Sequence, residues 1–354
     1  ILFLFISIME ESGYMSRVVF LMDRWLRPFG LNGKSVIPLM SGAACAIPAV
    51  MAARNIENPK ERLLTMLVTP FMTCSARLPI YIVIIGLVIP NHTFLGFNLQ
   101  GITLFIMYIL GIVGALASAW LLNRVIKSIR SSFLIFELPT YKNPDWKNVL
   151  TNVWDKASGF LWEAGKIILM ISIVLWVFGN FGPNRKFYQA EEIVQQANPN
   201  LSAEELEMEV GSYRLEHSFL GYIGMGIEPI VRPLGYDWKM GIGLISSFAA
   251  REVFVGTMAV VYSMGPDVDI EDEGQKSSLL TRMKSEINAN TGKPAYNFAS
   301  GISLLLFYAF AMQCMATIGV VRKETGSWKW TLVQTVFMTG LAYIAALIAY
   351  QILK

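Results

Sequence analysis

The sequence predicts an all-α protein, a polytopic membrane helical bundle with two repeats and with re-entrant or broken helices. Of its 354 residues, 54% are hydrophobic and only 16% are charged, and the mean hydropathy is +0.48. Soluble domains carry about 25% charged residues. The charged residues of this chain lie in a few stretches between long apolar runs. This pattern is typical of an integral membrane protein.

Several apolar runs are long enough to cross a bilayer, because a helix needs about 20 apolar residues to span about 30 Å of hydrocarbon. Residues 1–9 resemble the end of one further span, so we expect the chain to be a piece of a longer protein. The full-length runs occupy 63–89, 101–122, 160–181, 331–353 and, interrupted only by Gln313 and Cys314, 299–321.

Two other apolar runs are irregular. Residues 35–53 are short and contain Pro38, Gly42 and Pro48, and proline disrupts a helix interior. We predict a re-entrant hairpin there, whose irregular backbone must face protein or a wet cavity. Residues 240–264 carry charges near their centre, and either a second hairpin or a single crossing fits them.

The basic loops predict the orientation of the chain. Loop 123–158 contains six Lys or Arg residues, whereas loop 90–100 contains none. We therefore place 123–158 in the cytoplasm and 90–100 outside. Loop 54–62 then lies inside, together with the base of the first hairpin.

The sides of the later loops depend on residues 240–264. If these residues form a hairpin, loop 265–296 lies outside and residues 322–329 lie in the cytoplasm, and a single crossing reverses both assignments. Residues 182–239 contain an acidic, polar stretch and are predicted to be an extramembrane insert.

The Gly-Lys-Ser sequence at 33–35 is not expected to be a phosphate-binding P-loop. The motif G-x-x-x-x-G-K-[ST] requires glycine where this chain has Pro28, and two prolines follow in the next apolar run. The net charge of +3 is small and dispersed, which argues against a nucleic-acid partner.

Two pairs of segments indicate an internal repeat. LMSGAACA at 39–46 resembles LISSFAAR at 244–251, and MTCSA at 72–76 resembles MQCMA at 312–316. Broken helices at corresponding positions of two halves are typical of the substrate site of a transporter.

All three cysteines lie in these unusual apolar segments. Cys45 lies in the hairpin, Cys74 lies between Pro70 and Pro79, and Cys314 is the repeat counterpart of Cys74. A proline leaves an upstream carbonyl without its donor, and such carbonyls coordinate ions in membranes. The alternative is that each cysteine is simply a small buried hydrophobe.

Thiolate and thioether ligands favour the softer transition metals. We therefore predict a metal path lined by the cysteines, with Met72 and Met312 as auxiliary ligands. Glu10 and Glu11 end the first apolar run and either supply an oxygen ligand at the entrance or form an interfacial helix end. The two histidines lie in loops, which excludes a buried histidine-rich site.

Charged side chains inside a membrane usually face a cavity or a partner. Arg77, Arg251 and Glu252 lie deep in apolar runs and are predicted to gate the path or to lock the repeats. Glu163 and Lys166 lie three residues apart on one helix face, so they either pair at the interface or contribute to gating.

Four long motifs closely resemble the ferrous-iron transport protein B (FeoB) family, and the resemblance covers essentially the whole chain. The family pattern around Cys45 is G-x-G-C-x-x-P-A, and the second glycine is Ala44 here. The motifs are EESGYMSRVVFLMDR at 10–24, GLNGKSVIPLMSGAACAIPAVMAAR at 30–54, ENPKERLLTMLVTPFMTCSARLPIY at 57–81 and VRKETGSWKW at 321–330.

The resemblance implies uptake of Fe²⁺ across the bacterial inner membrane through two gate repeats, around 35–89 and 160–321. It implies no enzymatic reaction and no cofactor in this chain, since GTP and Mg²⁺ would bind an amino-terminal GTPase domain that precedes the membrane part. That domain, the lipid bilayer and small FeoA- or FeoC-type proteins are the implied partners, and homo-oligomerisation stays open. Cys45 and Cys74 match the cysteines of the family motifs.

These observations give a domain division and two rival functions. The first rival is a nucleoside or organic-anion carrier, which predicts Asn, Gln and acidic side chains at the hairpin tips. The second is an assembly module that only docks partner proteins.

The predicted divisions are a truncated helix and interfacial segment at 1–29, a first gate repeat with the following helix at 30–122, a basic cytoplasmic loop at 123–158, a second gate repeat at 159–330 and a final helix at 331–354.

Overall fold

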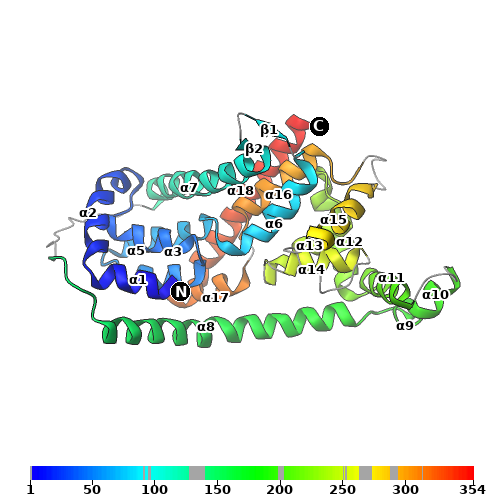
Figure 1. The fold of residues 1–354 in the computed structure, drawn as a ribbon, viewed down its shortest axis with the longest axis horizontal. Coiled ribbons are helices and arrows are strands. Elements are labelled where there is room, and N and C mark those ends of the chain that lie inside the picture. The colour runs from blue at the N-terminus through cyan, green and yellow to red at the C-terminus, as the bar shows by residue number, and fades with distance from the viewer. Residues whose placement is uncertain are drawn as a thin grey trace. The chain divides into compact units, whose positions relative to one another are not determined.

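The computed structural model describes residues 2–90, 92–94, 97–126, 140–197, 203–249, 251, 253–262, 273–287, 294–312 and 314–354 (Figure 1). The helices are α1 (Leu2–Glu11), α2 (Tyr14–Leu26), α3 (Val36–Gly42), α4 (Ala46–Ala52), α5 (Pro59–Val68), α6 (Leu78–Val88), α7 (Leu99–Val125), α8 (Trp146–Asn180), α9 (Arg185–Tyr188), α10 (Ala190–Ala197), α11 (Ala203–Glu216), α12 (Phe219–Val231), α13 (Trp238–Ala249), α14 (Val253–Val261), α15 (Glu273–Ser285), α16 (Phe298–Phe310), α17 (Met315–Thr325) and α18 (Trp328–Leu353).

Short 3₁₀ turns and one small hairpin complete the described secondary structure. The hairpin pairs β1 (Thr93–Phe94) with the antiparallel strand β2 (Phe97–Asn98). The 3₁₀ turns are η1 (Arg27–Phe29), η2 (Gly33–Ser35), η3 (Ala53–Asn55), η4 (Thr69–Phe71), η5 (Ser75–Arg77) and η6 (Arg232–Leu234).

The chain forms two compact units. The first contains 1–75, 108–167 and 316–338, and the second contains 76–107, 168–315 and 339–354. The long helices α7, α8 and α18 each contribute residues to both units.

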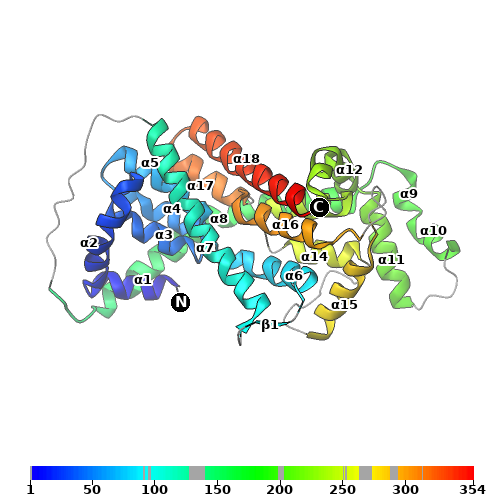
Figure 2. The same ribbon diagram turned by 90° about the horizontal axis from the view of Figure 1, so that it is seen from above.

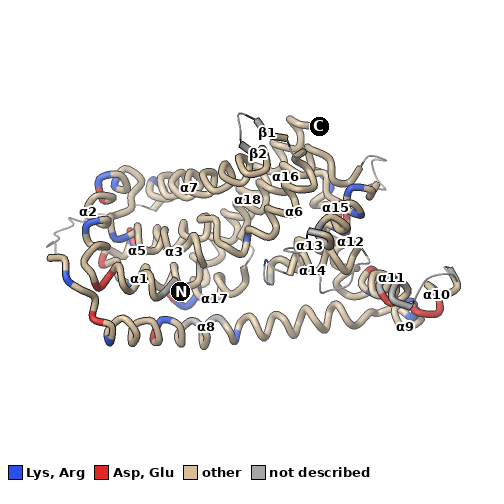
Figure 3. Tube along the Cα trace, viewed as in Figure 1, with Lys and Arg blue, Asp and Glu red and all other residues tan. Residues whose placement is uncertain are grey.

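Four helical stretches are long and apolar enough to cross a membrane, which confirms an all-α, multi-pass membrane architecture. They are Pro59–Val88, Leu99–Val125, Phe298–Thr325 and Trp328–Leu353. Each corresponds to one of the spans predicted from the sequence. Figure 3 shows that α7 and α18 carry almost no charge along their lengths.

The span predicted at 160–181 corresponds to the second half of a much longer helix, where the described residues contain only the shorter apolar stretch Gly165–Asn180. α8 contains 35 residues, which corresponds to about 52 Å at 1.5 Å per residue. Residues 146–158, which the sequence assigned to a basic loop, form its first part, and the charges of α8 lie mainly in this amino-terminal half (Figure 3). The basic side chains at 127–139 lie outside the described residues.

Residues 35–53 form the predicted hairpin of two short helices. α3 and α4 pack against each other, and the chain turns between them at 43–45. The prolines do not cause this turn. Pro38 and Pro48 are each the third residue of their helix, where the backbone N–H has no partner within the helix.

The described residues between 238 and 261 form a second hairpin rather than a single crossing. α13 and α14 contain 12 and nine residues, so each is too short to span about 30 Å, and they pack against each other. A Cβ atom built on Gly243 of α13 would lie 2.5 Å from Met258 Cε of α14.

Contacts within each unit agree with the loop positions that a second hairpin predicts. In the first unit, Arg54 binds Glu324, which joins loop 54–62 to residues 322–329. In the second unit, α6, which leads into loop 90–100, packs against α15 of the region 265–296, with Gly86 beside Leu280.

The structure reveals a longer repeat than the sequence comparison found. Arg-Pro-Phe-Gly at 27–30 and Arg-Pro-Leu-Gly at 232–235 both form a 3₁₀ turn that ends at a left-handed glycine, with φ of 79° at Gly30 and 88° at Gly235. Glycine adopts positive φ without the steric cost of a Cβ atom. α12 and η6 therefore belong to the second repeat, although they lie inside the segment 182–239 that was predicted as an extramembrane insert.

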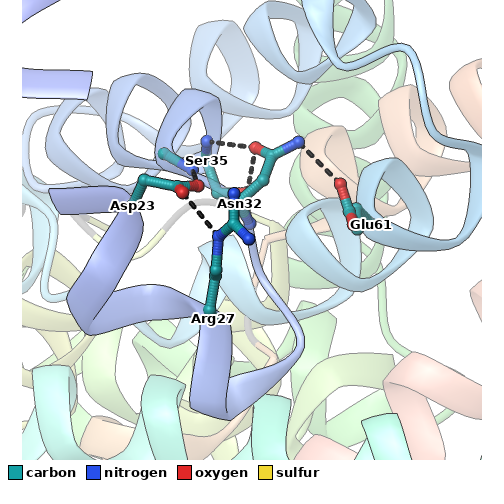
Figure 4. A network of polar contacts seen from close by, with 6 residues as sticks. Asp23, Arg27, Asn32, Ser35 and Glu61 are labelled. Atoms are coloured by element: carbon teal, nitrogen blue, oxygen red, sulfur yellow. Dashed lines mark hydrogen bonds and ion pairs between the residues drawn. The ribbon is translucent and has the colours of Figure 1, made fainter. Parts of the chain in front are cut away.

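Hydrogen bonds hold the base of the first hairpin (Figure 4). The backbone N–H of Gly33 donates to Asp23 Oδ1 at 2.8 Å, and the backbone N–H of Ser35 donates to Asn32 Oδ1 at 3.1 Å. Asn32 Nδ2 donates to Glu61 Oε2 of α5 at 2.7 Å. The Gly-Lys-Ser sequence thus forms the turn that leads into α3.

The described part of the segment predicted as an insert has its own small core. Ala190 and Val194 of α10 pack against Val210 of α11, with Leu206 and Tyr213 around them. Figure 2 shows α10 and α11 beside each other.

Candidate functional site

Cys45 lies at the tip of the first hairpin. It precedes the first residue of α4, and its backbone is extended, with φ of −153° and ψ of 132°. Its side chain is half-buried and carries a thiol rather than a disulfide.

Cys74 lies in the irregular stretch between η4 and η5, where the long apolar stretch Pro59–Val88 is interrupted. This side chain is also half-buried. Tyr108 of α7 is close enough to Cys74 to interact with it electrostatically. The sequence analysis missed Tyr108, although it is a polar side chain within an apolar span.

The two cysteine-bearing segments are joined directly. Ser75 follows Cys74, and both its backbone N–H and its hydroxyl donate to the carbonyl oxygen of Ala44, at 3.4 Å and 3.0 Å. Ala44 precedes Cys45. The residues next to the two predicted ligands therefore bond to each other, and both belong to the first unit.

Close packing surrounds this contact. A Cβ atom on Gly42 of α3 would lie 3.2 Å from Thr69 Cγ2 and 3.3 Å from Met72 Cβ. A Cβ atom on Gly111 of α7 would lie 2.6 Å from Thr73 Oγ1. Glycine thus lets the hairpin and α7 approach the stretch that carries Cys74.

The carbonyl oxygen that Pro70 deprives of its donor is not open to an ion. Pro70 lacks the N–H that would bond to Met66 O, but Gln334 Nε2 donates to this oxygen at 3.2 Å. Pro79 is the second residue of α6, where no helical bond is lost. The expectation that both prolines free a carbonyl for metal binding is therefore wrong in this conformation.

Cys314 and Met312 lie in the second repeat. Met312 is buried, and Cys314 is half-buried immediately before α17. Both belong to the second unit, so the structure does not place them relative to the first hairpin. Their part in a metal path stays a prediction.

The deep arginines are buried. Arg77 is 0% exposed at the start of α6. Arg251 is 6% exposed between α13 and α14, and its Nη2 donates to the carbonyl oxygen of Ala311 at 3.3 Å. Glu252 lies outside the described residues. The gating or locking roles of these residues stay predictions.

Of the remaining predicted charges, Glu10 and Glu11 lie at the end of α1, whereas Glu163 and Lys166 lie near the middle of α8. Lys156 of α8 lies 3.0 Å from Glu10, and Lys142 lies 3.0 Å from Glu11. Lys166 lies 5.3 Å from the centre of the Trp162 ring, and the side chain of Glu163 is outside the described part of the chain. Glu10 and Glu11 thus form ion pairs within the first unit. Neither they nor their partners belong to the segments that carry Cys45 and Cys74.

The described residues contain no cluster of three or more His, Cys, Asp or Glu side chains that could hold a metal ion. A site at Cys45 and Cys74 would accordingly be a two-thiol site completed by Met72, backbone carbonyls or water. Such an incomplete coordination shell suits an ion that must also leave.

Comparisons with known families agree with this architecture. The family model described as "Gate: Nucleoside recognition" matches residues 1–88 and 161–328, and the model described as "Ferrous iron transport protein B C terminus" matches residues 104–156. No solved structure matches the chain.

The curated relatives match nearly the whole chain. The Fe(2+) transporter FeoB of Leptospira interrogans is 43% identical over 353 residues, which are 99% of this chain and 48% of the relative. That of Helicobacter pylori is 36% identical over 360 residues, 99% of this chain and 53% of the relative. In Porphyromonas gingivalis, a fusion of Fe(2+) transport protein A with Fe(2+) transporter FeoB is 36% identical over 364 residues, 99% of this chain and 42% of the relative.

Two helical hairpins, broken helices and four long apolar stretches define a gate-type multi-pass membrane protein. The chain spans about half the length of the curated relatives it matches. It belongs to the ferrous iron transport protein B family and corresponds to the membrane portion of that family.

Proposed function

We propose that this chain is the permease portion of a bacterial Fe²⁺ importer of the inner membrane, and that the ion passes Cys45 and Cys74. The observation that supports this path is the bond between Ala44 and Ser75, which brings the two cysteine-bearing turns together. The relatives are named Fe(2+) transporters, and their names supply the substrate of the proposal.

The chemistry of the turn suits a soft divalent cation. Two thiols prefer Fe²⁺ and similar metals over Mg²⁺ or Ca²⁺, which require oxygen ligands. Met72 would add a thioether ligand from the same turn. Cys314 and Met312 would form the corresponding part of the path in the second repeat.

We further propose that a GTPase domain outside this chain controls the path, with GTP and Mg²⁺ bound there, and that the chain itself catalyses no reaction. The fused relative from Porphyromonas gingivalis supports a small FeoA-type protein as a partner.

A nucleoside carrier is the second candidate function, because the matching family model is described as nucleoside recognition. A nucleoside needs hydrogen-bonding side chains at the hairpin tip. Residues 43–46 at the first tip read Ala-Ala-Cys-Ala, which offers a thiol and no amide or carboxylate side chain. We therefore favour the metal.

Uptake of radioactive Fe²⁺ by cells that express the full-length protein tests the proposal. We expect Cys45→Ser combined with Cys74→Ser to lower uptake at least about tenfold, the scale on which metal sites respond to loss of supporting groups. Ala43→Ser is the matched control, because it adds a hydroxyl to the same turn without removing a thiol. Unchanged uptake in the double variant, or uptake of labelled nucleoside in place of iron, would refute the proposal.

A further inference from the structure

Pro70 creates a specific defect in the backbone of a membrane helix. An α-helix bonds the carbonyl of residue i to the N–H of residue i+4, so Met66 O would accept from residue 70. Proline has no N–H, and α5 ends at Val68. Within a bilayer no water can take the place of the missing donor, and an unsatisfied carbonyl is costly.

Gln334 of α18 supplies the missing donor. Its Nε2 donates to Met66 O at 3.2 Å and to Leu67 O at 2.9 Å. The phenyl rings of Phe337 and Phe71 pack edge to face beside this contact, with centroids 6.2 Å apart. All five residues belong to the first unit.

The burial of Gln334 shows that this contact is specific. Only 22% of the most apolar stretch of α18 is buried within the protein, yet Gln334 is 2% exposed. An amide in an apolar environment is unfavourable unless it forms hydrogen bonds. Here Nε2 forms two, while Oε1 is buried without a hydrogen-bond partner among the described residues. The one buried glutamine of this helix therefore lies where the backbone of another helix lacks a donor.

We propose that Gln334 is a positioning residue that compensates for Pro70 and thereby couples α18 to the stretch that carries Cys74. The bond fixes the last turn of α5, and η4 and Cys74 follow within eight residues of Met66. A displacement of α18 would then move Cys74 relative to the hairpin. This last step rests on the proposed function, whereas the compensation of Pro70 does not.

A double-mutant cycle tests the compensation. Gln334→Met keeps the side-chain volume but removes the donor, and we expect it to lower the unfolding midpoint of the full-length protein in lipid nanodiscs by at least about 2 °C. In a Pro70→Ala background, residue 70 regains an N–H for Met66 O, so the same substitution should cost less than half as much. If Gln334→Met folds only in that background, the coupling is equally established.

The matched control is Gln351→Leu, because Gln351 is an exposed glutamine of the same helix whose bond to Pro233 O is long at 3.5 Å. It should behave alike in both backgrounds. Equal losses from Gln334→Met with and without Pro70 would overturn the proposal.

Cobalt binding separates a positioning role from a purely structural one. Co²⁺ bound by thiolates absorbs in the near ultraviolet, and we expect Gln334→Met to weaken the Cys45- and Cys74-dependent band about tenfold in affinity. Unchanged affinity in a destabilised variant would contradict the positioning role. Absence of the band in the unmodified protein would refute the proposed metal path and leave the stability cycle as an independent test of the compensation.

Discussion

The hydroxyl of Ser75 lies 3.0 Å from the carbonyl oxygen of Ala44 and donates a hydrogen bond to it. This bond joins the tip of a hairpin to the interruption in a membrane-spanning stretch, at residues adjacent to Cys45 and Cys74. A side-chain bond of this kind contributes about 1 kcal/mol, which is enough to fix the turn and weak enough to open.

Ser75→Ala removes the hydroxyl but keeps the backbone bond. We expect a loss of about 0.5–1.5 kcal/mol in the free energy of unfolding, together with weaker Co²⁺ binding, measured by titration of the thiolate band. Ser158→Ala removes an exposed hydroxyl bond to Asp155 O on α8 and serves as the control. Equal cobalt affinity in the two variants would contradict a role for Ser75 in holding the cysteines.

Gly111→Ala should disturb the same stretch from α7. The added methyl group would lie 2.6 Å from Thr73 Oγ1 and 3.2 Å from the Phe71 carbonyl oxygen, so the chain must shift, at a cost of about 1–3 kcal/mol. Gly101→Ala on the same helix meets no atom within 4 Å and should be neutral or slightly stabilising. Thermal unfolding of both variants checks this contrast, and equal midpoints would disprove the close approach.

The raised pKa of Asp237 predicts that the stability of the second unit depends on pH. Burial raises its pKa, although the Met240 N–H and Lys239 lower it, while Glu286 raises it further. The folded state therefore retains a proton that the unfolded chain loses near a pH of about 3.9, and stability falls as the pH rises through the interval up to the raised pKa.

Asp237→Asn should remove this cost and keep the cap, because an amide oxygen also accepts from the Met240 N–H, as Asn32 does with Ser35 in the first repeat. We expect the variant to gain stability relative to the original protein at pH 7 and little at pH 4, measured by thermal unfolding at both pH values. A gain of equal size at both would show that ionisation of Asp237 is not the cause.

The ion pairs of the first unit should differ in strength according to burial. The Glu324 side chain is only 6% exposed, so Arg54→Gln should cost about 1.5–3 kcal/mol. Lys142→Gln, at a pair whose lysine is 62% exposed, should cost at most about 1 kcal/mol. Denaturation of the two variants compares them, and a larger loss for Lys142→Gln would contradict this ranking.

The sequence predicted four of its five full-length spans and the first hairpin, because apolar length and proline content depend on local residues alone. At 160–181 the described residues contain only the shorter apolar stretch Gly165–Asn180. The sequence could not decide between a hairpin and a crossing at 240–264, since the answer depends on packing between α13 and α14. It also overestimated the loop before α8, because residues 146–158 are polar enough to resemble a loop but continue the helix.

The site was predictable only in part. Cys45 and Cys74 stand out in the sequence, but the bond between Ala44 and Ser75 involves two unremarkable small residues 31 positions apart. Gln334 carried a signal, as an amide in the interior of an apolar span, yet its partner at Met66 follows only from the fold. The expectation of open carbonyls failed because a distant helix satisfies the one beside Pro70.

The central claim is that Cys45 and Cys74 bind the transported ion together. X-ray absorption of Fe²⁺ bound to the purified full-length protein under anaerobic conditions measures this directly. We predict a sulfur shell at about 2.3 Å, the distance typical of metal–thiolate bonds, which is lost in the Cys45→Ser and Cys74→Ser double variant and retained in Ala43→Ser. A shell of oxygen and nitrogen alone in the unmodified protein, or a sulfur shell that survives the double substitution, would contradict the claim.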